Sequence, residues 1–463
     1  MSQAFRIEKD TMGEMRVPAD AYYGAQTARA LENFPVSGQA IPRPVIRALG
    51  ILKGAAATVN MELGGLAKDL GAAIERAAAE VAEGKLDRHF VVDVFQTGSG
   101  TSSNMNANEV IANRAGELLG KALGSKAVHP NDHVNMGQSS NDVFPTAVQL
   151  GLALTIQEQL LPELGRLAEA LHGLADRTFA QVKTGRTHLM DAMPIRYGQE
   201  FRGYAGQVER GAARIGQALE DLCEVPLGGT AVGTGVNADP RLAQGICKLV
   251  ARDHGVRLRE TTNHFQAQAC LDAVVHASGA LRAFATGFYK FANDIRWMSS
   301  SIMGELKIPE VQPGSSIMPA KVNPVICESV LMLCGQVFAN DGAVAFGNSQ
   351  GQFELNTMMP FVARNAIESA TLLAHGARMF REKCLAGVEV TAEAARRVHR
   401  NPILATALNK AIGYEHAAKI AKEAAAKGLT VREIAAQQTQ VPPAELDRLL
   451  DPARLCGEWG KSR

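Results

Sequence analysis

Residues 281–298 carry the sequence LRAFATGFYKFANDIRWM, in which large apolar side chains recur at alternating steps of three and four. This spacing places one apolar stripe along a helix, which packs against neighbouring helices. Residues 160–174 and 201–222 repeat the spacing, and Pro162 should begin or kink the first of these helices. Because no alternating run of β-branched residues is long enough for a sheet, the sequence predicts a mainly α protein with a central bundle of long helices.

Polar, glycine-rich stretches interrupt the helical patterns at residues 124–140, 227–240 and 309–324. A largely apolar helix is expected between 325 and 348, and the chain after about residue 356 is alanine-rich with shorter helical patterns. We therefore predict three domains, namely 1–138 (mostly helical), 139–355 (the long-helix bundle) and 356–463 (small and helical). The bundle helices are apolar on more than one face, so oligomerisation through helix–helix contacts is expected.

Composition excludes several classes of protein. The 463 residues include 48 Lys and Arg against 47 Asp and Glu, a net charge of +1 that argues against a protein built to coat nucleic acid or an acidic membrane. The first ten residues lack a signal-peptide core, and no window offers about 18 uninterrupted apolar residues, the minimum for a transmembrane helix. The 7 cysteines are scattered without a CxxC pair, which indicates reduced thiols in the cytoplasm and no iron–sulfur or zinc site.

The densest group of reactive side chains lies in GSSIMPAKVNP, residues 314–324. Its prolines forbid a continuous helix, so the segment is predicted to be a loop with two hydroxyls, an ammonium group and an amide. Lys321 and Asn323 can bind a carboxylate, and a serine facing N–H groups and a lysine can act as a base. A solvated connector loop is the alternative.

Three further loops have the same character. TGSGTSSN, residues 97–104, precedes an expected helix at 105–116, and GQSSND occupies 137–142. Donors at a helix N-terminus bind anions, although ordinary N-capping uses the same residues. GRTH, residues 185–188, stands between two long helical patterns, and a lone histidine is often only structural. Four such loops in one helical protein favour a site for a carboxylate-bearing substrate.

Other candidate motifs are weaker. His129 and His133 are spaced as metal ligands on a helix face, but Pro130 and Asn131 between them favour a turn or a helix start. The glycine-rich run 228–235 follows no strand pattern and is therefore not a dinucleotide-binding fingerprint.

The segment GSSIMPAKVNP resembles the signature of the fumarase/aspartase superfamily, and the resemblance covers nearly the whole chain. Within the superfamily it is closest to class II fumarate hydratases. Four segments carry this similarity, namely QTGSGT at 96–101, NMGQSSNDVFPT at 135–146, GRTH at 185–188 and FELN at 353–356. Ala320 and Val325-Ile326 depart from it and are more similar to aspartases.

The resemblance implies a homotetramer with a shared helical core and active sites built from three subunits. It implies a lyase that adds water reversibly and in anti fashion to fumarate, giving (S)-malate through an aci-carboxylate intermediate, in the tricarboxylic acid cycle. No cofactor, metal, nucleic acid or membrane is implied.

Residue roles follow from the same resemblance. Ser315 would be the base, His188 would manage the proton of the departing hydroxyl, and Glu328 would orient His188. Lys321, Asn323 and loop N–H groups would stabilise the intermediate. The substrate-binding set comprises Ser99, Gly100, Thr101, Ser139, Ser140, Asn141, Thr187, Ser316, Lys321, Val322 and Asn323. A secondary dicarboxylate site would be formed by His129, Pro130, Asn131 and Asp132.

Alternative functions remain beside this one. Aspartate ammonia-lyase is the alternative within the superfamily, and an assay of malate against aspartate separates the two. A non-catalytic helical scaffold is an alternative of another class, since the superfamily includes a lens structural protein. A metal-dependent hydratase would lose its activity to a chelator.

Overall fold

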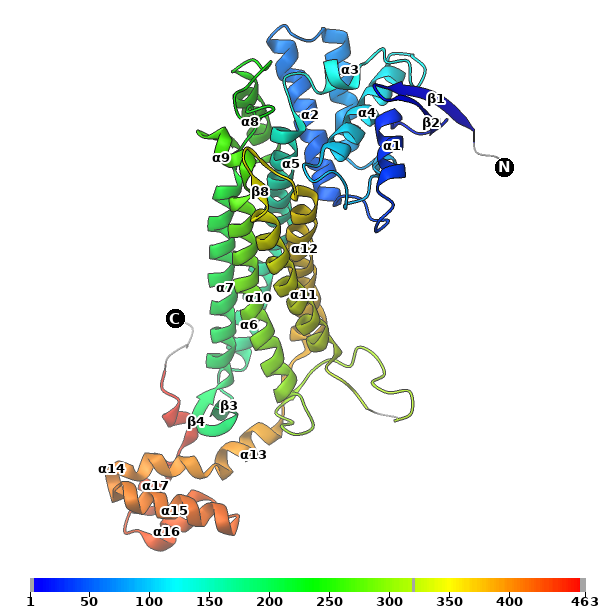
Figure 1. Cartoon of the computed structure of the whole chain (residues 1–463). Helices are drawn as coiled ribbons and strands as arrows, with labels where there is room; N and C mark the ends of the chain where they lie inside the picture. Colours follow the sequence, from blue (N-terminus) through cyan, green and yellow to red (C-terminus); the bar gives the residue numbers. More distant parts are fainter. Residues whose placement is uncertain (1–3, 319–320, 459–463) are drawn as a thin grey trace. The chain divides into compact units, whose positions relative to one another are not determined.

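The computed structural model describes residues 4–318 and 321–458. Helices dominate, as predicted (Figure 1). Internal contacts divide the chain into two compact units, the first comprising residues 1–162, 213–283 and 335–373, and the second comprising 163–212, 284–334 and 374–463. The proposed domain boundaries at 138/139 and 355/356 remain predictions.

The first unit contains the N-terminal helices. Helix α2 packs against α3, α5 and α8, and α3 also packs against α4 (Figure 1). A hairpin of β1 and β2 lies beside α1. The bounds are β1 Phe5–Asp10, β2 Gly13–Pro18, α1 Ala25–Asn33, α2 Arg43–Glu62, α3 Lys68–Ala82, α4 Thr101–Leu118, α5 Ser140–Thr155, α8 Leu242–His254 and α9 His264–Ala269.

Helix α4 begins earlier than expected. The predicted loop 97–104 ends at Gly100, so Ser102, Ser103 and Asn104 belong to the helix. Serine and asparagine are weak helix formers in isolation, but here Ser103 and Asn104 are buried in the unit. Tertiary burial therefore overrides local propensity.

The predicted long helices are confirmed as α6 Leu161–Arg177, α7 Tyr197–Leu222, α10 Asp272–Met298 and α11 Val325–Asn348. Helix α12 Met359–Lys383 is also long, although only shorter helices were expected after residue 356. In the second unit the stripe of α10 forms an aromatic core, in which the Phe288 ring packs 5.1 Å from Phe291 and 5.5 Å from Phe380 between ring centroids. Before Pro162 the helix adopts π hydrogen bonding over Ile156–Leu160, which accommodates the missing proline N–H.

The C-terminal part of the second unit is a cluster of short helices (Figure 1). Its own core is made by residues such as Leu408, Ile420, Ile434 and Leu446. The elements are α13 Ala392–Arg400, α14 Asn409–Ile412, α15 Tyr414–Lys427, α16 Val431–Gln438, α17 Pro443–Leu449 and α18 Pro452–Leu455. The shorter helices expected in this part of the chain are thus confirmed.

The strands of the described residues form two-stranded pairings, and no larger sheet occurs among them. GRTH, predicted to lie between helical patterns, belongs to a hairpin of β3 Val182–Thr187 and β4 Met190–Arg196. The short pairings are β5 Glu224–Val225 with β6 Arg259–Glu260, β7 Leu306–Lys307 with β10 Glu389–Val390, and β8 Gly351–Gln352 with β9 Leu355–Asn356. The β3 sequence VKTGRT lacks apolar alternation, so its pattern gave no strand signal.

Helix α11 is apolar on all sides. By length and composition it is the one helix in the described part of the chain that could cross a membrane, yet only 33% of its most apolar window is buried within the chain. It also carries Glu328 and Asp341, and Asp341 accepts hydrogen bonds from Ser278 and Arg282 on α10. Such a helix needs a further apolar partner for its exposed surface.

Candidate active site

Two helix N-termini meet in the first unit and bring together one predicted group of substrate-binding residues. The Thr101 hydroxyl at the start of α4 lies 2.7 Å from the Ser140 hydroxyl at the start of α5, and Ser99 lies 2.8 Å from Thr101. Each N-terminus carries about half a positive charge and unpaired N–H groups. The arrangement is suited to holding a carboxylate.

Gly100 makes the entry into α4 possible. Its φ is +71°, and a Cβ at this position would lie 2.3 Å from the Phe144 ring. Only glycine satisfies both the conformation and the close approach. Gly100 is therefore needed for the backbone conformation at the start of α4.

The α5 N-terminus is braced by the glycine-rich run 228–235. The wholly buried Asp142 carboxylate accepts N–H donors from Ser139 at 2.9 Å, Thr230 at 2.9 Å and Gly228 at 3.1 Å. Burial raises the pKa of Asp142, while these backbone donors oppose the shift. Asn141 donates to the Ala231 carbonyl at 2.8 Å. The glycine-rich run thus supports the binding loop.

His188 lies at the turn of the β3–β4 hairpin in the second unit. His188 and Leu189 form its two-residue turn, with φ of +56° and +60°, the pattern of a type I′ turn that normally favours asparagine and glycine. Positive φ is strained for both residue types. Thr187 and His188 are exposed there. Strained backbone at an exposed histidine is typical of functional sites.

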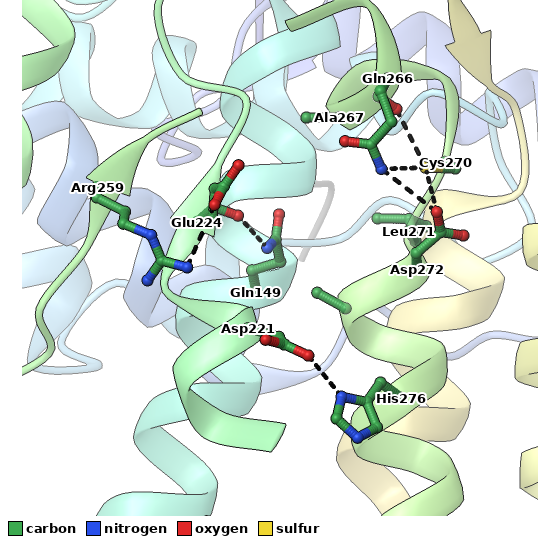
Figure 2. Close-up of a pocket in the computed structure, with 11 residues that line it drawn as sticks. Gln149, Asp221, Glu224, Arg259, Gln266, Ala267, Cys270, Leu271, Asp272 and His276 are labelled. Atoms are coloured by element: carbon green, nitrogen blue, oxygen red, sulfur yellow. Dashed lines mark hydrogen bonds and ion pairs between the residues drawn. The ribbon is translucent and has the colours of Figure 1, made fainter. Parts of the chain in front are cut away.

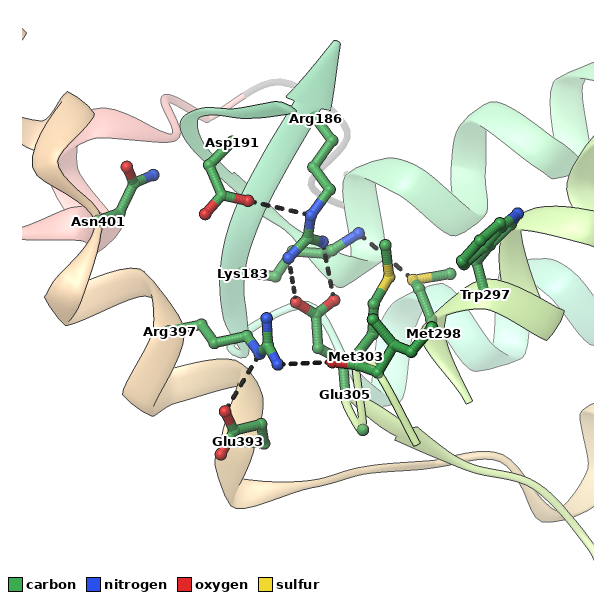
Figure 3. A network of polar contacts seen from close by, with 12 residues as sticks. Lys183, Arg186, Asp191, Trp297, Met298, Met303, Glu305, Glu393, Arg397 and Asn401 are labelled. Atoms are coloured by element: carbon green, nitrogen blue, oxygen red, sulfur yellow. Dashed lines mark hydrogen bonds and ion pairs between the residues drawn. The ribbon is translucent and has the colours of Figure 1, made fainter. Parts of the chain in front are cut away.

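An ion pair fixes this hairpin (Figure 3). The Arg186 guanidinium binds the Glu305 carboxylate through two contacts of 2.5 and 3.0 Å, and the Glu305 side chain is 0% exposed. Arg186 also bonds Asp191 across the hairpin at 3.1 Å. At the other end of β3, the buried Lys183 bonds Glu200 at 2.8 Å. The hairpin is therefore held at both ends of β3.

The 309–324 loop folds back on itself. The Ser315 hydroxyl oxygen accepts N–H donors from Ile317 at 3.2 Å and Met318 at 3.0 Å. Asn323 donates to the Gly314 carbonyl at 2.7 Å, and Gly314 N–H donates to the Lys321 carbonyl at 2.9 Å. Donors on a hydroxyl oxygen favour its deprotonated form. Ser316, Lys321 and Val322 are exposed on the same loop, whereas Ala320 lies outside the described residues.

Glu328 occupies the first turn of α11. Its carboxylate lies 3.9 Å from Arg296, and within the described residues of one chain no hydrogen bond joins it to His188. Nor does a hydrogen bond join His188 to Ser315 or Lys321 there. The pairing of Glu328 with His188 therefore stays a prediction, in which the two residues come from different chains.

A separate cavity of about 350 Å³ in the first unit contains most of the predicted secondary site. His129, Pro130 and Asn131 line it together with Lys9 and Lys126, which the sequence analysis missed. Asp132 is not in its lining, and its side chain is 75% exposed. The two lysines could attract a dianion, and the same lining also contains the carboxylates of Glu8, Asp10 and Glu109.

The turn or helix start expected at residue 130 is confirmed. His129 caps the short π-helical turn Pro130–Val134, accepting a hydrogen bond from Asp132 N–H at its Nδ1. His133 Nδ1 accepts from the His129 N–H at 2.9 Å. The described residues contain no group of three side chains arranged to hold a metal ion.

Comparisons with known proteins show the family to which the chain belongs. A family model described as lyase matches residues 13–339, and one described as fumarase C C-terminus matches 404–457. A class II fumarate hydratase of Mycobacterium tuberculosis is 50% identical over 97% of this chain and 96% of its own. The chain belongs to the class II fumarate hydratase family.

Solved structures place the fold of this lyase in the same family. A class II fumarase of Schistosoma mansoni has a TM-score of 0.93 and 35% identity, over 98% of this chain and 100% of its own. A fumarate lyase/delta crystallin of Brucella melitensis has a TM-score of 0.94 and 43% identity over the same shares. The resemblance inferred from the sequence is thus confirmed.

Acidic residues also line another cavity of this lyase, of about 410 Å³ (Figure 2). Its charged groups are already paired, with Asp221 bonded to His276 at 2.6 Å, Glu224 to Arg259 at 3.2 Å and Asp272 to Cys270 at 3.0 Å. Burial raises the Cys270 pKa to about 11, so its thiol is protonated at neutral pH. The pairing leaves this cavity without the unpaired donors found at α4 and α5.

Proposed function

We propose that the protein is a cytoplasmic fumarate hydratase that interconverts fumarate and (S)-malate within the tricarboxylic acid cycle. The observation that carries the proposal is the convergence of hydroxyl and N–H donors from Ser99, Thr101 and Ser140 at two helix N-termini. A four-carbon diacid supplies the anionic groups that such donors bind. Membership of the family supports the reaction class.

The reaction proceeds by proton abstraction beside a carboxylate. Ser315 Oγ, deprotonated and held by the Ile317 and Met318 N–H groups, takes the proton from C3 of malate. The C–H electron pair moves into the adjacent carboxylate and gives the aci-carboxylate, whose added charge Lys321 and Asn323 offset. Asn323 retains a second N–H for this, since one already binds the Gly314 carbonyl.

Loss of hydroxide then completes the elimination. His188 donates a proton to the departing hydroxyl, directly or through a water, and the electron pair returns to form the fumarate double bond. Thr187, beside it, binds a carboxylate together with Ser139, Asn141, Ser316 and Val322. Glu328 fixes the imidazole tautomer.

These groups come from both units, and we propose that they meet between chains of a homotetramer. Helix α11 supports this assembly, because its side chains Met332, Phe338 and Phe346 are exposed in the single chain. Packing α11 against its copies would bury this surface. Each active site would then combine the helix N-termini of one subunit, the His188 hairpin of a second and the Ser315 loop of a third.

The His129 cavity is proposed as a secondary dicarboxylate site, because lysine side chains there could bind carboxylates. Lys126, whose ammonium group donates to the Lys9 carbonyl at 2.8 Å, lines it beside His129. Lys9 and Lys126 would attract the same class of ligand, because the carboxylates of this lining, Glu8, Asp10 and Glu109, are already paired with Arg6, Arg29 and the Gly24 N–H.

The test follows the absorbance of the fumarate double bond with purified protein, malate or aspartate, and EDTA. We expect fumarate from malate, none from aspartate, and no change with EDTA. Consumption of aspartate with malate inert would replace the proposal by aspartate ammonia-lyase. Loss of activity in EDTA would indicate a metal-dependent hydratase, and inactivity on both substrates would leave a scaffold.

A further inference from the structure

Lys53, on α2, is a wholly buried charged residue directly behind the two helix N-termini of the candidate site. Its ammonium group donates to Asn135 Oδ1 at 2.7 Å, which is its hydrogen-bond partner among the described residues. Burying an ammonium group with one neutral partner is costly, and the cost requires an explanation. Neither the sequence patterns nor the proposed mechanism uses this residue.

Asn135 connects Lys53 to both carboxylate-binding segments. The Oδ1 atom that binds Lys53 also accepts hydrogen bonds from Asn108 at 3.2 Å and Asn104 at 3.3 Å, both on α4. Its amide nitrogen donates to the Gln138 carbonyl at 3.0 Å, directly before Ser139. One amide therefore links Lys53 to the start of α4 and to the start of α5.

The surroundings of Lys53 leave both its charged and its uncharged form accessible near neutral pH. Burial lowers the pKa of Lys53 to about 7, and the Asp142 carboxylate, the charged group that acts on it, partly opposes the shift. The α4 side chains that face Asn135 are neutral amides, and Asp142 is engaged by three backbone N–H groups. A negative ligand nearby would favour the charged form of Lys53.

We infer that Lys53 is a positioning residue for the dicarboxylate, holding the Asn135 bridge and compensating the ligand's charge from behind the α4 and α5 N-termini. The inference rests on the proposed function. When a dianion binds, the fraction of Lys53 that is uncharged in the free protein takes a proton from solvent. Binding is then linked to proton uptake. The affinity for the dianion therefore falls once the pH rises above the value at which Lys53 is half-protonated in the free protein.

The experiment measures succinate binding, because this saturated diacid binds without reacting. Titration calorimetry in buffers of different ionisation enthalpy gives the affinity and the number of protons taken up. For the wild-type protein we expect proton uptake near pH 7 and a Kd that rises with pH. For Lys53→Met, whose unbranched side chain is uncharged and only slightly shorter, we expect a Kd about 10-fold higher and little proton uptake.

Two controls separate this role from a structural one. Lys248→Met makes the same substitution at an exposed lysine of α8 in the same unit and should leave Kd and proton uptake unchanged. Lys53→Met should unfold at the same or a higher temperature than the wild-type protein, since it removes a buried charge. In turnover, KM should rise more than kcat falls.

The two possible failures are distinguishable. If Lys53→Met retains the wild-type Kd and proton uptake while both proteins hydrate fumarate, the inference is overturned and the proposed function stands. If Lys53→Met loses affinity only in proportion to unfolding seen by circular dichroism, the positioning role is likewise overturned. If the wild-type protein neither binds succinate nor hydrates fumarate, both fail together.

Discussion

At the scale of single residues, the backbone at His188 and Leu189 is the most informative feature of the proposed site. Two consecutive non-glycine residues with positive φ are held in the short hairpin turn. Left-handed backbone costs about 1 kcal/mol or more for each such residue. The positive φ angles of this turn persist because the ion pairs of β3 and β4 hold the hairpin in place.

Replacing Leu189 by glycine should stabilise the protein. Its side chain is 70% exposed, so little packing is lost within the chain, while glycine adopts the φ of +60° without strain. Allowing for the greater unfolded-state entropy of glycine, we expect a gain of about 0.5–1 kcal/mol by denaturant unfolding. Leu189→Ala, which removes the same side chain but keeps Cβ, is the control. A glycine variant no more stable than the alanine variant would refute the strain argument.

Replacing His188 by asparagine should lower the hydration rate about 100-fold, the size expected for loss of a general acid. The imidazole is removed while a polar side chain compatible with positive φ remains. Initial rates with malate and fumarate measure the effect. His172→Asn, which replaces a histidine paired with Glu209 on the helix surface, should retain full activity. Wild-type rates in His188→Asn would remove this residue from the mechanism.

Sequence motifs predicted candidate residues for the site but not the contacts that hold them. The hydroxyl-rich loops were predicted from residue type, and Thr101 and Ser140 do meet. Lys53 was missed because a lysine inside an apolar helix resembles a surface residue until burial is known. Its only sequence signal was its position within the otherwise apolar α2 stretch.

At the scale of elements, helices could be predicted and hairpins could not. The stripes of α6, α7 and α10 repeat every three or four residues over many turns, which gives a strong signal. The β3–β4 hairpin is short, bulged near Gly185 and held by ion pairs, so its sequence lacks an alternating pattern. Its stability comes from Arg186 and Glu305, which are 119 positions apart.

The Arg186–Glu305 pair makes a prediction about this hairpin. Arg186→Met leaves the Glu305 carboxylate buried without its partner and should cost about 3 kcal/mol of stability. Adding Glu305→Leu removes the unpaired charge and should recover most of that loss. Denaturant unfolding of the single and double variants gives the coupling energy.

An exposed pair provides the comparison. Arg448→Met, which breaks the pair with Glu445 on the surface of α17, should leave the unfolding midpoint almost unchanged. If Arg186→Met and Arg448→Met lowered the stability to unfolding equally, burial of the Arg186–Glu305 pair would have no energetic consequence.

At the scale of the whole molecule, α11 connects stability to assembly. Its surface is apolar all round, but much of it is exposed in one chain. An isolated chain with such a surface would associate in water. In the proposed tetramer the same helix makes the core and brings the parts of the site together.

A charge on α11 should therefore dissociate the protein and abolish activity together. Met332 is 70% exposed, and Met332→Glu would place a carboxylate within the proposed core. Light scattering should report a mass below that of the tetramer, with at least a 100-fold loss of hydration. Tyr414→Glu, at a 75% exposed aromatic in the C-terminal cluster, should change neither mass nor rate. A Met332→Glu tetramer with normal activity would place the interface elsewhere.

The hydroxyl contacts at α4 and α5 have a directional consequence. Asn141 Oδ1 can only accept, so Ser140 donates to it at 3.5 Å, Thr101 donates to Ser140, and Ser99 donates to Thr101. All of these hydroxyl hydrogens then point along the row and none points at a ligand. An incoming carboxylate must turn at least one O–H rotor outward. Ser99 is the first donor of the row, so its hydroxyl can turn to the ligand while Thr101 and Ser140 keep their own hydrogen bonds.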